Sequence, residues 1–77
     1  MHREQDRTKF VELAEKRVRR AIKDLRLIGN LSNRSNYAYN GTDVKKILQA
    51  LNRELRELER RFESSGGTSE IDFRLED

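Results

Sequence analysis

The side chains that most often carry out chemistry are scarce in this chain. It has no cysteine and a single histidine, His2, beside Met1. One histidine cannot build a catalytic triad, a di-iron site or a histidine pair for zinc. The four glycines lack the spacing of a phosphate-binding loop, and Glu54 and Glu57 lie among arginines, which indicates surface ion pairs. We therefore expect no enzyme, no catalytic residue, no metal site and no cofactor.

The chemistry that remains is binding, and the most distinctive polar segment is residues 30–41. It combines amide side chains, one guanidinium and two tyrosine rings, which could contact a base, a nucleotide or a partner protein. The alternative is that such residues cap helix ends and close a loop. We favour that structural role for Asn30, Tyr37 and Tyr39. The candidates for binding nucleic acid or a partner are Asn33, Arg34 and Asn36.

Basic residues are concentrated in one part of the chain. Residues 16–34 hold seven basic side chains against one acid, Asp24, whereas residues 57–77 hold seven acids against three arginines. Five basic residues, here called the basic ridge, are candidates for contact with a phosphate backbone: Lys16, Arg19, Arg20, Lys23 and Arg26. A second set faces outward later in the chain, but Glu54, Glu57 and Glu59 weaken its field: Lys46, Arg53, Arg56 and Arg60. The alternative for both sets is an ordinary solvated helix face.

Helical periodicity predicts the elements that position these residues. We expect one helix over about residues 5–28, a loop over 29–42 and a second helix over about 43–63. Gly29 is predicted to end the first helix as a left-handed cap, and Thr42 or Asp43 to cap the start of the second. Residues 1–63 would then form the helical domain. Residues 64–77 would form a Gly/Ser linker and an acidic tail, a flexible region in which Ile71, Phe73 and Leu75 alternate as in a strand. The tail is either disordered or a strand that docks on a partner.

Both expected helices carry an apolar stripe. In the first, the stripe contains Phe10, Ala14, Val18, Ala21, Leu25 and Ile28, widened by Val11 and Ile22. In the second, six apolar residues step by four and three, which is the heptad pattern of a coiled coil: Val44, Leu48, Leu51, Leu55, Leu58 and Phe62. The predicted fold class is all-α, an antiparallel two-helix hairpin.

A chain of 77 residues without a disulfide or a metal buries little apolar area by itself. A two-helix hairpin also leaves one side of its stripe in water. Two leucines, Leu13 and Leu27, lie off the main stripe and would be exposed in a monomer. We therefore expect self-association into a homodimeric four-helix bundle, with higher assemblies as the alternative. The predicted interface residues are Leu13, Leu27, Leu48, Leu51, Leu55, Leu58 and Phe62.

The stretch from Leu27 to Tyr37, which contains the letters IGNLSNRSNY, is followed by Tyr39 and by Asp43 to Ile47. This pattern resembles a group of small bacterial and mobile-element proteins that have a similar loop between two helices and no assigned activity. The likeness covers about residues 10–62, and the loop is its most specific part. It implies a helical hairpin and a connection with prokaryotic genomes, phages or plasmids. It implies no role for any single residue.

These observations favour a non-enzymatic oligomeric protein that binds nucleic acid or a nucleoprotein complex through the basic ridge and the loop. One alternative is a phage- or plasmid-encoded adaptor or inhibitor that binds a host protein, and another is a purely structural oligomerisation module. The mean hydropathy of −1.02 and the lack of a long apolar run argue against a membrane span or a secretory signal. We expect a cytoplasmic protein with no membrane partner.

Overall fold

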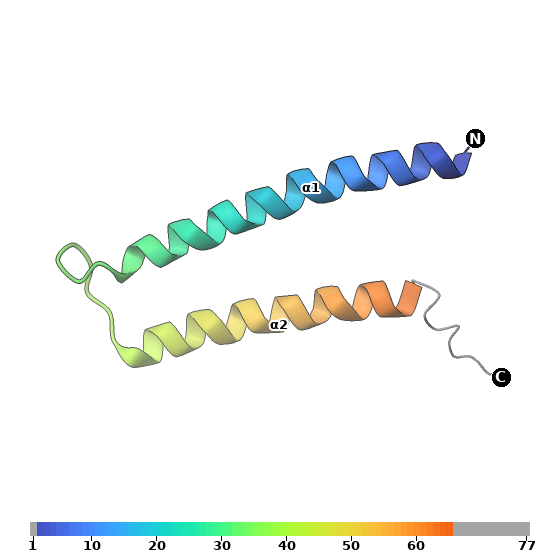
Figure 1. Cartoon of the computed structure of the whole chain (residues 1–77). Helices are drawn as coiled ribbons and strands as arrows, with labels where there is room; N and C mark the ends of the chain where they lie inside the picture. The colour runs from blue at the N-terminus through green and yellow to red at the C-terminus, as the bar shows by residue number, and fades with distance from the viewer. Residues whose placement is uncertain (1, 66–77) are drawn as a thin grey trace. The chain divides into compact units, whose positions relative to one another are not determined.

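The computed structural model describes residues 2–65, and within that range the chain is all-α, as predicted (Figure 1). It contains α1 (His2–Gly29), a short 3-10 helix η1 (Asn30–Ser32) and α2 (Gly41–Ser65), with no strand among these residues. The described residues divide between Ala38 and Tyr39 into two units, one built on α1 and the other on α2. The predicted strand at Ile71, Phe73 and Leu75 lies outside the described residues.

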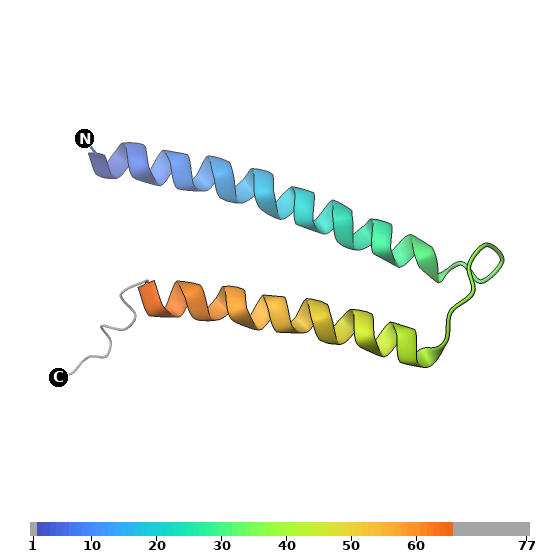
Figure 2. The same cartoon turned by 180° about the vertical axis from the view of Figure 1, so that it is seen from behind.

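The first unit is dominated by α1, which has 28 residues and is unbroken in both views of the ribbon (Figures 1 and 2). The expected range was about residues 5–28. Helix formation is favoured because no glycine or proline interrupts residues 2–28. Glu4 lies in the first turn and Arg26 in the last, where each charge complements the helix dipole.

The end of α1 differs from the prediction at Gly29. We expected a left-handed cap there, but Gly29 has φ −61° and ψ −30°, which is right-handed helical geometry. The chain continues directly into η1 and leaves helical geometry only at Asn33, with φ −71° and ψ 101°. The prediction of a left-handed cap was therefore wrong, because the tighter 3-10 turn takes over the end of the helix.

The second unit consists of α2, which has 25 residues, with the segment that leads into it. The expected range was about residues 43–63, with Thr42 or Asp43 as the cap. Instead, Asn40 caps the helix: the Asp43 amide donates to Asn40 Oδ1 at 2.8 Å. In return, the Asn40 amide donates to Asp43 Oδ2 at 3.0 Å. These two bonds form a reciprocal capping box, in which Asp43 supports the cap from the third helical position.

Neither unit has an interior of its own. Among residues 3–65, whose side chains the structure describes, none is buried. The best-covered positions are half-buried: Val11, Leu13, Ala14, Ile28, Tyr39 and Leu51. The stripe of α2 is open to water, with Leu55 62% exposed and Phe62 58% exposed. The apolar residues of each helix therefore form a continuous face that is open to solvent.

Candidate binding surfaces

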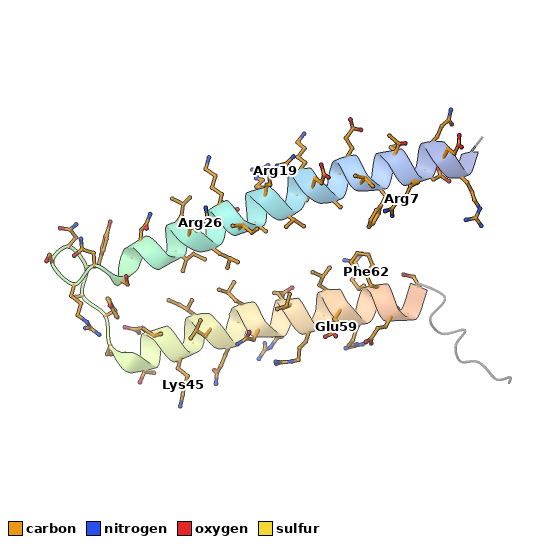
Figure 3. The ribbon with its side chains drawn as sticks, viewed as in Figure 1. Arg7, Arg19, Arg26, Lys45, Glu59 and Phe62 are labelled. Atoms are coloured by element: carbon orange, nitrogen blue, oxygen red, sulfur yellow. The ribbon has the colours of Figure 1, made fainter. Side chains whose placement is uncertain are left out.

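The basic ridge lies entirely on α1, and all five of its side chains are exposed. Arg19 and Arg26 are labelled in Figure 3. One ridge residue has an acidic neighbour: Arg19 Nη1 lies 4.0 Å from Glu15 Oε1, with both side chains more than half exposed. Glu12 and Lys16 are also four residues apart on α1, and they form no ion pair among the described residues. The ridge therefore keeps most of its positive charge available to a ligand.

The second basic set, on α2, is more strongly neutralised. Arg60 Nη1 donates to Glu57 Oε1 at 3.2 Å, which confirms that Glu57 takes part in a surface ion pair. A shallow surface depression at the end of α2 is lined by acidic and basic side chains in equal number: Glu57, Glu63, Arg60 and Arg61, with Ser64. An evenly balanced lining favours neither an anion nor a cation. The α1 ridge is the stronger candidate for an anionic ligand.

The loop residues chosen as binding candidates form a compact turn. Asn33 Oδ1 accepts a hydrogen bond from the Ser35 amide at 2.9 Å. The Asn33 carbonyl accepts from the amides of Asn36 and Tyr37 at 3.1 and 3.0 Å. Asn33 is thus a structural residue of the turn, because its side-chain oxygen and its backbone carbonyl both accept hydrogen bonds within it. Arg34 and Asn36 lie within this turn and are exposed.

The predicted interface residues are found on both helices. Leu27 on α1 is 54% exposed, whereas Leu13, which we expected to be exposed, is half-buried. On α2, Leu51 is half-buried, and the remaining four are exposed: Leu48, Leu55, Leu58 and Phe62. Figure 3 shows Phe62 and Lys45 leaving α2 on different sides, as expected for an amphipathic helix.

Two features were not found by reasoning from the sequence. The capping box was missed although Asn40 and Asp43 have the required spacing of three, because Asn followed by Gly is also typical of a turn. A cation–π contact was also missed: the Arg7 guanidinium lies 5.9 Å from the centre of the Phe10 ring. Its spacing of three residues on a helix could have indicated it. This contact places positive charge beside an aromatic residue of the α1 stripe.

Comparison with protein-family models, curated proteins and solved structures finds no match to this chain. Within residues 2–65, neither α1 nor α2 combines the length and apolar character needed to cross a membrane. In the same part of the chain, no group of three or more histidine, cysteine or acidic residues is placed to hold a metal ion.

Proposed function

We propose that this chain is a non-enzymatic binding protein that self-associates through its apolar stripes and engages the phosphate backbone of nucleic acid through the basic ridge. The supporting observation is the division of each helix into two faces. Large apolar residues lie exposed on one face, and basic residues lie exposed on another. A self-associating protein would bury the first face and leave the second free for a ligand.

Self-association is supported by the extent of the uncovered apolar face. Thirteen large apolar residues are exposed among the described residues. Burying one such side chain contributes about 1.5–3 kcal/mol, so covering several of them can outweigh the entropy lost on association. We propose that the helices fold back as an antiparallel hairpin and that two hairpins form a four-helix bundle.

Binding of nucleic acid is supported by the position and the charge of the ridge. Lys16, Arg19, Lys23 and Arg26 step by three, four and three residues, so they follow one side of α1 over about 15 Å. This length matches several phosphates of a backbone, and guanidinium groups bind phosphate oxygens in a bidentate manner. Arg34, in the turn beyond η1, would add a further cation.

Salt dependence tests this proposal. We expect a fluorescently labelled DNA duplex to bind with an affinity that falls steeply as salt rises. Four phosphate contacts give a slope of about −3.5 in log affinity against log salt concentration, per chain. Replacing Lys16, Arg19, Lys23 and Arg26 by glutamine should weaken binding at least tenfold and flatten the slope.

A matched control removes four positive charges from α2 instead, at Lys46, Arg53, Arg56 and Arg60. This control variant should lose less affinity than the ridge variant, because Glu57 already neutralises part of that surface. Equal loss in the two variants would mean that only net charge attracts the duplex. Absence of binding at low salt, with an intact oligomer, would leave the chain as an oligomerisation module and contradict the nucleic-acid proposal.

A further inference from the structure

We infer that the partner that covers the α2 stripe is the α2 helix of a second copy, running antiparallel, with the two-fold axis near Arg53. This inference rests on the proposed self-association and adds the surface, the direction and the register of that contact. It follows from the exposed heptad pattern of α2 and from the charges that flank the stripe.

The spacing of the stripe is symmetric about Arg53. When a second α2 is reversed about that residue, Val44 falls opposite Phe62 of the second copy. In the same register, Leu48 falls opposite Leu58, and Leu51 opposite Leu55. All six stripe residues therefore find an apolar counterpart in a single register, and the contact is isologous, as a two-fold dimer requires. No stripe position is left opposite a charged residue.

Charge selects the antiparallel direction. One edge of the stripe, here called the Lys45 flank, carries Lys45, Asn52 and Glu59 at intervals of seven residues. Reversal about the axis places Lys45 of each copy beside Glu59 of the other and brings the two Asn52 side chains together. Two attractive ion pairs and one amide pair result, with no like-charge contact along this flank. All three side chains are exposed and lie within the described part of α2.

A parallel pairing of the same helices would be less favourable. In that arrangement, residues on one flank meet residues five positions later on the opposite flank of the partner helix. Glu54 would then meet Glu59 of the other copy, twice by symmetry, and Lys45 would gain no acidic partner on α2. In the antiparallel pair, the same reversal brings the two Glu54 side chains near each other on the opposite flank, so one like-charge contact remains there, against two in the parallel pair.

A distance measurement tests the direction. The chain has no cysteine, so a spin label at Thr42→Cys is unique. Thr42 lies 11 residues before Arg53, so the antiparallel register separates the two labels by about 33 Å along the helix. A parallel pair would bring them within about 15 Å of each other. The full chain is used, and its mass is measured by light scattering under the same conditions.

A charge exchange tests the contact itself. Lys45→Glu alone and Glu59→Lys alone should each raise the dimer dissociation constant about tenfold, because each turns two attractive pairs into repulsive ones. Combining the two should restore the wild-type value. The matched control combines Lys45→Glu with Glu54→Lys, which has the same composition and net charge but should not restore dimerisation.

These measurements separate the failure of this inference from the failure of the proposed self-association. A long label distance together with recovery in the charge exchange supports the antiparallel contact. A dimer with a short distance, or without recovery in the exchange, overturns this contact and leaves self-association intact. A monomeric mass at all concentrations overturns both. Far-UV circular dichroism of each variant shows whether the helices are retained, so that loss of the dimer is not confused with loss of helix.

Discussion

At the scale of single residues, the start of α2 depends on Asn40 and Asp43. Their reciprocal bonds of 2.8 and 3.0 Å satisfy two backbone amides that the helix itself leaves without partners. Both groups are exposed, so the contribution is that of a helix cap and not of a buried hydrogen bond. The same two bonds also determine the residue at which α2 begins.

We expect Asn40→Ala to lower the free energy of unfolding by about 1 kcal/mol, because it removes the side-chain acceptor of the cap. Urea unfolding followed by far-UV circular dichroism measures this loss. Asn36→Ala is the matched control in the same loop, where only the backbone amide is seen to bond, and it should change stability by less than about 0.5 kcal/mol. An equal effect of the two substitutions would argue against the capping role.

Glu15 provides a second prediction at this scale. Its contact with Arg19 is long, at 4.0 Å, and both side chains are well exposed, so Glu15→Gln should change helix stability by less than about 0.5 kcal/mol. The same substitution should strengthen binding to a DNA duplex, since it removes a negative charge beside the basic ridge. Glu57→Gln on α2 is the control and should raise affinity less. A fluorescence anisotropy titration that gives the reverse order would count against the ridge.

Predictions for single residues were confirmed where the residue types are compatible with only one local structure. The acid at Glu57 was expected to pair with an arginine, and Arg60 does so. The cap of α2 was misplaced because Asn40 followed by glycine is typical of a turn as well as of a helix start. Gly29 was misassigned because a glycine at a helix end can also continue as a right-handed 3-10 turn. In both cases the competing conformations differ by about 1 kcal/mol, which residue types alone do not decide.

At the scale of elements, the two helices differ in the regularity of their apolar faces. The stripe of α2 repeats by fours and threes from Val44 to Phe62, whereas α1 has a wider stripe with Leu13 and Leu27 outside it. In a regular heptad, every step of three or four residues returns to the same face of a helix. The sequence therefore predicts α2 as one continuous helix. The half-burial of Leu13 could not be predicted, since it depends on how neighbouring side chains on the same helix are oriented.

Leu55 is the most exposed large apolar residue among those described, at 62%, and yet we expect it to be one of the most sensitive positions. In a single chain, Leu55→Ala would remove few contacts. In an assembly that covers the α2 stripe, it would remove a buried leucine and cost about 2–5 kcal/mol. Analytical ultracentrifugation should show a dissociation constant raised by at least tenfold.

The control for Leu55 is Gln49→Ala, on the opposite face of α2, which should leave the dissociation constant within about threefold of the wild type. If Leu55→Ala assembles as well as Gln49→Ala does, the α2 stripe is not the contact surface, and the α1 stripe becomes the candidate.

At the scale of the whole molecule, stability and concentration are linked. Most helical stability in proteins comes from the packing of an apolar face, and none of the described side chains of α1 and α2 is buried. We expect the thermal midpoint to rise by several degrees for each tenfold increase in protein concentration, because association stabilises the folded state by mass action. Circular dichroism melts over a hundredfold concentration range measure this shift. A midpoint that is independent of concentration, together with a monomeric mass, would contradict self-association.

The absence of a buried side chain among residues 3–65 has a consequence for how substitutions will behave. In most small domains, a core mutation and a contact mutation give separable defects, one in folding and the other in complex formation. Here the same leucines would serve both purposes, so the two defects would merge into one phenotype. A damaged chain would then be rescued by raising its expression level, and a mixture of damaged and intact chains would share the defect. A dominant phenotype of a substitution in an apolar stripe would therefore indicate that the stripe lies in the contact between chains.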